Sequence, residues 1–96
     1  MSQPVMPSYA QDKPSFGVIN YVISNLVLRE FRTIRTSRID NIKIIKEFIS
    51  QYNGRYCIEV TYNRIADTGQ IFPEQGKFNF EKKGDIWYGG KGGWGP

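Results

Sequence analysis

The sequence predicts a small two-layer α+β domain, with one amphipathic helix at about residues 38–53 packed on an antiparallel β-sheet or meander. Three observations lead to this class. Apolar residues recur at three- and four-residue steps in the middle of the chain, apolar and polar residues alternate in the next segment, and turn-forming residues divide the remainder into short strands. The chain of 96 residues is long enough for one domain with one modest core.

The two ends of the chain differ in composition from the middle. Residues 1–14 contain three prolines among small polar residues, so we expect an extended, Pro-rich arm there rather than a helix or a central strand. Residues 90–96 form a Gly-rich tail. A single α+β domain is therefore predicted over residues 15–89, with an extended tail on each side.

The most apolar stretch, FGVINYVISNLVLREF at residues 16–31, is compatible with either a strand or a helix. Its polar residues scatter around a helical wheel instead of gathering on one face. Periodicity alone does not separate the two structures in an apolar run of this length. A buried strand is favoured because five residues of the stretch are β-branched, namely Val18, Ile19, Val22, Ile23 and Val27.

The predicted helix rests on the spacing of isoleucines in SRIDNIKIIKEFISQYNG. Ile39, Ile42, Ile45 and Ile49 recur at the steps that place side chains on one helical face. Ser37 followed by Asp40 resembles a capping box with the shorter acid. Asn53-Gly54 supplies residues that tolerate a left-handed C-terminal turn.

The segments after this predicted helix indicate an antiparallel meander. RYCIEVTYNRI alternates as a half-buried strand does, and ADTGQ predicts a turn into a return strand that Pro73 either stops or marks as an edge. A further hairpin is predicted from Lys77–Glu81 and Asp85–Tyr88. Trp87 and Tyr88 then point to opposite faces, and one of them is expected to join the core.

Positive charge is concentrated in one part of the chain. The net charge is +4, from 13 Lys and Arg against 9 Asp and Glu. Residues 29–46 hold six basic and two acidic residues, a local excess equal to the whole net charge. Arginine occupies every third position at Arg29, Arg32, Arg35 and Arg38, and it suits bidentate contact with carboxylate or phosphate. The alternative is a solvated run of charges, partly paired with nearby acids.

The composition argues against catalysis and against bound metals or cofactors. Histidine is absent, which removes the commonest general base and metal ligand. Without a histidine to activate it, the single cysteine, Cys57, is expected to be a small apolar residue of a strand. The carboxylates show no spacing that forces a catalytic or metal-binding group. We therefore expect neither an enzyme nor a bound cofactor.

The sequence favours a small non-catalytic interaction protein, an accessory subunit or regulator of a larger protein complex, which binds its partner through its tails, the exposed face of its sheet and the arginine cluster. Its expected partner is a larger protein, or a multi-subunit complex, with an acidic surface. A cytoplasmic location without a membrane span is expected, because one cysteine forms no internal disulfide and no apolar run is long enough to cross a bilayer. The predicted partner-binding residues combine the basic run with the aromatic C-terminus, and they are Arg29, Arg32, Arg35, Arg38, Trp87, Tyr88, Lys91 and Trp94.

The alternative function is a module that binds nucleic acid, namely RNA. The Arg29–Arg38 cluster would contact phosphates while aromatic residues stack on bases. The sequence lacks a GXXG loop and the aromatic-basic octamer of RRM domains. Nucleic acid is therefore kept as the second hypothesis.

Overall fold

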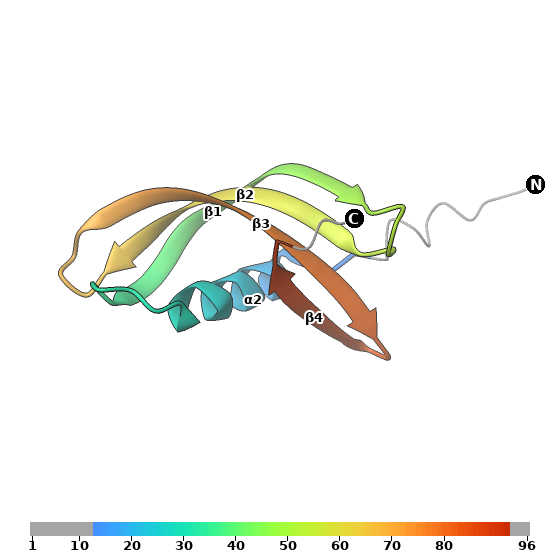
Figure 1. The fold of residues 1–96 in the computed structure, drawn as a ribbon, viewed down its shortest axis with the longest axis horizontal. Helices are drawn as coiled ribbons and strands as arrows, with labels where there is room; N and C mark the ends of the chain where they lie inside the picture. Colours follow the sequence, from blue (N-terminus) through green and yellow to red (C-terminus); the bar gives the residue numbers. More distant parts are fainter. Residues whose placement is uncertain (1–12, 93–96) are drawn as a thin grey trace, which may run out of the picture.

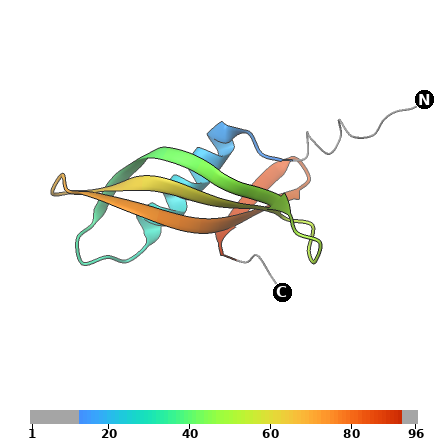
Figure 2. The ribbon, with the colours of Figure 1, turned by 90° about the horizontal axis from the view of Figure 1, so that it is seen from above.

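The computed structural model describes residues 13–92, which form one helix and a four-stranded antiparallel sheet. The sheet order is β1-β2-β3-β4, so each strand pairs with the next along the chain. The sheet arches over the helix, which crosses beneath it (Figures 1 and 2). The predicted class, a small α+β domain with one helix on an antiparallel meander, is confirmed. The elements are α2 (Phe16–Arg29), β1 (Thr36–Ile49), β2 (Tyr56–Ala66), β3 (Ile71–Lys83) and β4 (Ile86–Lys91).

The helix is not where it was predicted, because residues 38–53 form most of β1 and the turn that follows it. The turn residue Gly54 has a φ of 71°, so the Asn-Gly pair serves a β1–β2 turn rather than a helix end. Ser50 accepts from the backbone N–H of Gly54 at 2.8 Å and donates its own N–H to the carbonyl of Arg55 at 2.9 Å. A helix C-terminus and a turn between strands both require a residue that tolerates positive φ, so the Asn-Gly pair could not distinguish a helix from a strand before it.

A β-bulge explains why β1 carries helix-like spacing. A register shift in the pairing with β2 places Asn41 and Ile42 together opposite Tyr62, and Asn41 takes a φ of 56°. The extra residue converts the two-residue alternation of a strand into a three-residue step, so Ile39 and Ile42 both face the core. Two further register shifts occur in the same strand. The bulge thus accounts for the step from Ile39 to Ile42, whereas Ile45 and Ile49 do not share their face and are 54% and 55% exposed.

The preference for a strand over residues 16–31 is also wrong, because Phe16–Arg29 is the helix α2. Ser15 caps it by accepting the N–H of Val18 at 3.2 Å. Its buried face follows the i, i+3, i+4 pattern of an amphipathic helix, with Ile19, Ile23 and Val27 almost fully buried. Packing of this stripe outweighs the small helix-propensity cost of β-branched residues.

The core lies between α2 and the concave face of the sheet. The helix stripe packs with apolar residues of β2 and β3, and the largest fully buried side chains are those of Phe78 and Phe80. Beside them, β4 runs close to the helix at Gly89, where an added Cβ would lie 2.4 Å from Val22 Cγ1. A glycine is thus needed where β4 meets α2.

The predicted half-buried strand is present as β2, but the predicted return strand after residue 70 and the predicted strand Lys77–Glu81 are one continuous strand, β3. β3 runs without interruption through Pro73. This part of β3 pairs with β2 but not with β4, so Pro73 lies at an edge of the sheet, which was one of the two predicted alternatives. β4 extends through Gly90 and Lys91, into the predicted Gly-rich tail. Residues 1–12 of the predicted arm and residues 93–96, which include Trp94, lie outside the described residues.

Candidate partner-binding site

A cleft of about 690 Å³ lies at the C-terminal end of α2, along its connection to β1. We call it the connection cleft. Three of the four arginines of the predicted cluster, Arg29, Arg32 and Arg35, line it. The other lining residues are Leu28, Glu30, Phe31, Thr33 and Thr36.

The connection is tied to the rest of the fold on both sides of Phe31. The Glu30 carboxylate accepts from Arg32 at 3.0 Å and also pairs with Lys91 at the end of β4. The backbone carbonyl of Arg35 accepts the N–H of Asp67, in the β2–β3 turn, at 2.9 Å. The segment that carries Phe31 is therefore fixed to β4 at one end and to the β2–β3 turn at the other.

A partly buried charge network lies next to the connection cleft, with Glu74 of β3 at its centre. The Glu74 carboxylate accepts from Arg64 Nε at 2.8 Å, from Arg32 Nη1 at 3.3 Å and from the Tyr62 hydroxyl at 3.2 Å. Burial alone would raise the pKa of Glu74, but the hydrogen bond from Arg64 and the charges of Arg32 and Arg64 outweigh it and hold the pKa below its ordinary value. Glu74 is thus ionised and fully engaged at neutral pH.

Arg64 is the most deeply placed charge of this network. Its side chain is 8% exposed, and its guanidinium lies 4.5 Å from the centre of the Phe72 ring. Arg64 Nη1 also donates to the Thr36 hydroxyl at 3.3 Å, where β1 begins. The network therefore holds the start of β1, which lines the connection cleft, against β2 and β3.

Tyr62 gives this network a measurable pH dependence. Burial, followed by the charge and hydrogen bond of Glu74, raises the pKa of Tyr62 to about 12. The folded protein therefore holds the phenolic proton more tightly than the unfolded chain, whose tyrosine titrates near pH 10. We expect the contribution of Tyr62 to stability to be complete below pH 10 and lost as the pH rises to about 12.

The measurement is urea unfolding between pH 8 and pH 12, compared for the wild-type chain and Tyr62→Phe. Tyr56 also has a raised pKa, owing to burial and to the Glu47 carboxylate, and it is present in both chains. The wild-type chain should lose more stability above pH 10 than the variant does. Identical alkaline losses in the two chains would contradict the assignment to Tyr62.

Of the remaining predicted site residues, Arg38, Trp87 and Tyr88 lie apart from the connection cleft, Lys91 lies beside it through its contact with Glu30, and Trp94 lies outside the described residues. Arg38 lies in β1 and pairs with Asp40 at 2.9 Å, an exposed ion pair of the kind that stabilises proteins little. Trp87 packs against the core, whereas Tyr88 is 51% exposed, as expected for neighbours on opposite strand faces. The structure thus brings together Arg29, Arg32, Arg35 and Lys91.

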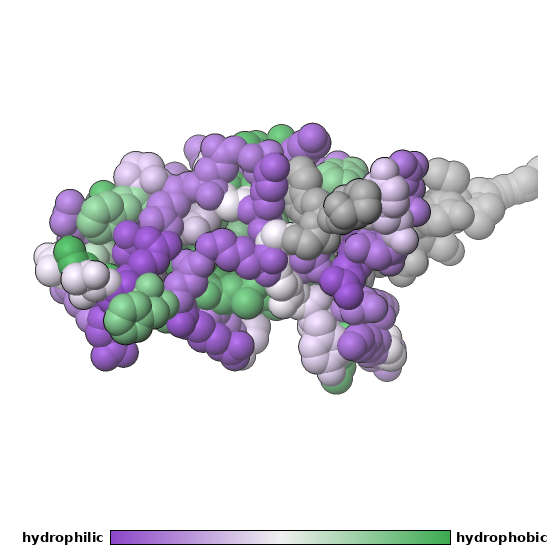
Figure 3. Space-filling view, viewed as in Figure 1, coloured by the Kyte–Doolittle hydropathy of each residue, from purple (hydrophilic) through white to green (hydrophobic). Residues whose placement is uncertain are grey.

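An exposed apolar row is the feature that sequence reasoning missed. The Phe31 side chain is 96% exposed, and Leu28 and Ile34 are each 41% exposed. These residues recur at the same three-residue step as the arginines, which is the signal that was available in the sequence. Figure 3 shows apolar atoms among hydrophilic ones at the end of the molecule where the connection and the β2–β3 turn lie.

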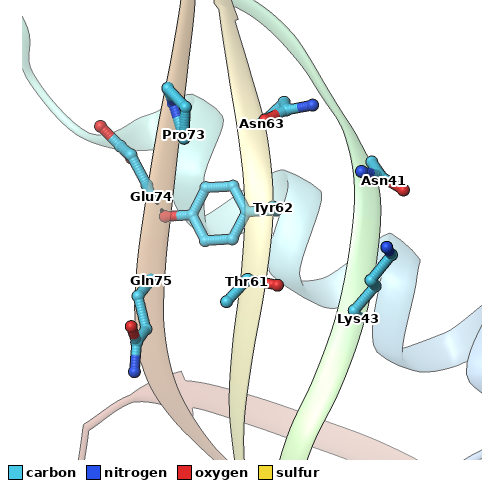
Figure 4. A pocket seen from close by; sticks show the side chains of 8 residues that line it. All are labelled: Asn41, Lys43, Thr61, Tyr62, Asn63, Pro73, Glu74 and Gln75. Carbon is cyan, nitrogen blue, oxygen red and sulfur yellow. Dashed lines mark hydrogen bonds between the residues drawn. The ribbon is translucent and has the colours of Figure 1, made fainter.

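A second depression, of about 400 Å³, crosses three neighbouring strands (Figure 4). Its lining is mainly amides and hydroxyls, and Lys43 is the one cation among the lining residues. The Tyr62 hydroxyl and the Glu74 carboxylate in this lining are hydrogen-bonded to each other. It offers less charge and less apolar surface than the connection cleft. The lining residues are Asn41 and Lys43 from β1, Thr61, Tyr62 and Asn63 from β2, and Pro73, Glu74 and Gln75 from β3.

Cys57 is fully buried, and burial raises the pKa of its thiol, which favours the unreactive protonated form. Within residues 13–92, no three His, Cys, Asp or Glu side chains gather as a metal site would require. No helix in this described part of the chain combines the length and apolar character of a membrane span.

Comparisons of the chain with protein-family models, with curated proteins and with solved structures give no match. The residues of the connection cleft are therefore the feature of this chain that bears on function. Their chemistry is cationic and apolar, on a backbone that the fold holds in place.

Proposed function

We propose that this protein is a small non-catalytic interaction protein, an accessory subunit or regulator that binds an acidic surface of a larger partner through the connection cleft. The observation that carries the proposal is the 96% exposed Phe31 between Arg29 and Arg35. Neither guanidinium group forms a hydrogen bond or ion pair with another described residue. Aromatic and arginine side chains dominate binding energy at protein interfaces, and unpaired cations favour acidic partners.

The other charged groups near the cleft support a binding role over a catalytic one. Burial would raise the pKa values of Glu30 and Glu74, but the hydrogen bonds and charges of the cations that hold them outweigh it and keep both pKa values below the ordinary value. A general base requires a pKa near the operating pH. Arg38 and Tyr88 lie apart from the connection cleft and stay predicted partner contacts.

Nucleic-acid binding is the second candidate, because an exposed aromatic residue among arginines also suits base stacking. It predicts a logarithmic loss of affinity with salt, of slope roughly 0.7 to 0.9 for each phosphate contact. A protein partner is favoured because two of the three exposed apolar side chains of this segment, Leu28 and Ile34, are aliphatic, whereas stacking on bases uses aromatic rings.

Affinity capture from lysate of the native host tests the proposal. The full chain is used as bait at low and high salt, with and without nuclease. We expect nuclease-resistant capture of a protein, reduced roughly tenfold by Arg35→Glu because the ligand carboxylates then meet a like charge. The matched control is Lys43→Glu, which makes the same charge change at another exposed cation.

Each further outcome has a distinct meaning. Capture that nuclease abolishes would support the nucleic-acid alternative. An empty capture at low salt, or equal losses in Arg35→Glu and Lys43→Glu, would contradict binding through the connection cleft.

A further inference from the structure

The connection between α2 and β1 has a regular chemical pattern. Residues 28–36 consist of three triplets, LRE, FRT and IRT, each with an apolar residue, an arginine and a polar residue. All three apolar side chains are at least 41% exposed, and Phe31, at 96%, is almost wholly in solvent. The connection therefore presents a row of apolar side chains together with a row of cations.

The middle triplet differs from its neighbours in charge state. Arg32 is neutralised by Glu30 at 3.0 Å and by Glu74 at 3.3 Å. Arg29 and Arg35 have no such partner among the described residues. A ligand therefore meets two available cations with exposed Phe31 between them along the chain.

The connection is organised before any ligand binds. Glu30, at the helix C-cap, leaves the helix with φ −66° and ψ 134°, which is extended backbone. Its contact with Lys91, the Arg32–Glu74 pair and the bond from Asp67 to Arg35 hold the segment on both sides of Phe31. Binding then needs little ordering of the protein, which favours affinity.

The side-chain types distinguish between possible occupants. Only one of the three exposed apolar residues is aromatic, and base stacking needs π faces, whereas Leu28 and Ile34 suit aliphatic or aromatic side chains of a peptide. Arginine binds carboxylates bidentately. A peptide can present a carboxylate and an apolar side chain within a few residues of each other.

We infer that the connection cleft binds a segment of the partner polypeptide in which an apolar side chain is flanked on both sides by Asp or Glu. The apolar side chain packs on Phe31, and the flanking carboxylates pair with Arg29 and Arg35. The inference rests on the proposed function and adds the local sequence pattern of the partner.

Fluorescence anisotropy at low salt with a short labelled peptide tests this inference. The peptide has one Phe flanked by Glu residues in a Gly-Ser background, and its two matched forms replace Phe by Ser or Glu by Gln. We expect each replacement to weaken binding to the full chain roughly tenfold. Phe31→Ser and Arg35→Glu in the protein should have the same effect.

Two variants serve as controls for surface aromatics and surface charge. Tyr52→Ser removes a 63% exposed ring from the β1–β2 turn, and Lys43→Glu reverses a charge on β1; neither should alter binding. Thermal unfolding of Phe31→Ser should match that of the wild-type chain, which separates lost binding from lost folding.

Four results would overturn the inference. They are equal binding of the Gln peptide, equal binding of the Ser peptide, tighter binding of an oligothymidylate that depends on Phe31, and no peptide binding at all. If no peptide binds but the wild-type chain captures a protein from lysate and Arg35→Glu does not, the proposed function stands, with a folded acidic surface as the ligand. If the wild-type chain also captures no protein from lysate, the proposed function itself is contradicted.

Discussion

Replacing Glu74 by alanine is expected to destabilise the protein by about 3–5 kcal/mol, because it leaves the Arg64 guanidinium buried without a charged partner. Arg64 is 8% exposed at its side chain and donates to Glu74 at 2.8 Å. The same substitution removes acceptors from Arg32 and Tyr62. The free energy of unfolding, measured with urea at pH 7, checks this result.

The control for this prediction is Glu81→Ala, which removes an ion pair with Arg55 whose side chains are 38% and 42% exposed. Its loss should stay below about 1 kcal/mol. A double variant, Glu74→Met with Arg64→Met, removes both charges and should recover most of the stability lost in Glu74→Ala. Equal small losses in Glu74→Ala and Glu81→Ala would show that the buried pair is not the source of stability.

Replacing Gly89 by alanine is expected to destabilise the protein by about 1–3 kcal/mol through overpacking. A Cβ at this position would lie 2.4 Å from Val22 Cγ1 and 3.0 Å from Phe80 Cε2. The Phe80 ring is fully buried, so β4 or α2 must shift to relieve the contact. Urea unfolding measures the net loss of stability. This net loss is slightly smaller than the packing cost, because alanine lowers the conformational entropy of the unfolded chain.

The neighbouring glycine supplies a matched control. At Gly90 the nearest atom to an added Cβ is Asn79 Nδ2 at 3.7 Å, an ordinary contact distance. Gly90→Ala should therefore change stability far less than Gly89→Ala. Adding Val22→Ala to Gly89→Ala should recover part of the loss, since it removes the clashing methyl group. If the two glycine variants unfold alike, close approach of β4 to α2 is not what requires glycine.

The Glu74 network links the stability of the domain to its proposed binding surface. Arg32 and Thr36 both line the connection cleft, and both are held by members of the network. A variant that loosens Glu74 should therefore disturb the orientation of the cleft before the domain unfolds completely. Binding measurements on Arg29 and Arg35 variants avoid this complication, because these residues lie outside the network.

The sequence by itself determined the fold class and the strands of the C-terminal half. The alternation in β2 is a local pattern, and its apolar side chains, such as Ile58 and Val60, are buried as that pattern predicts. The basic cluster was visible for the same reason, because charge and spacing are properties of neighbouring residues. Three of its four arginines do line one cleft.

The assignment of the helix and the first strand was decided only by tertiary structure. Both segments carry β-branched residues at three- and four-residue steps, so their local patterns are nearly the same. The pairing of β1 with β2 accommodates the extra residue near Asn41 as a bulge, whereas residues 16–29 form a helix that packs across the sheet. Local spacing could not separate these outcomes, because the bulge depends on the partner strand.

The site also depends on contacts between segments far apart in the chain. Glu30 meets Lys91, and Arg32 meets Glu74, only because α2 ends beside β3 and β4. These contacts neutralise one arginine of the cluster and leave two available, which the spacing of arginines alone does not reveal. Charge and composition can be read from neighbouring residues in the sequence. The pairing of the charges, and the exposure of Phe31 between two unpaired arginines, follow from the packing of the whole domain.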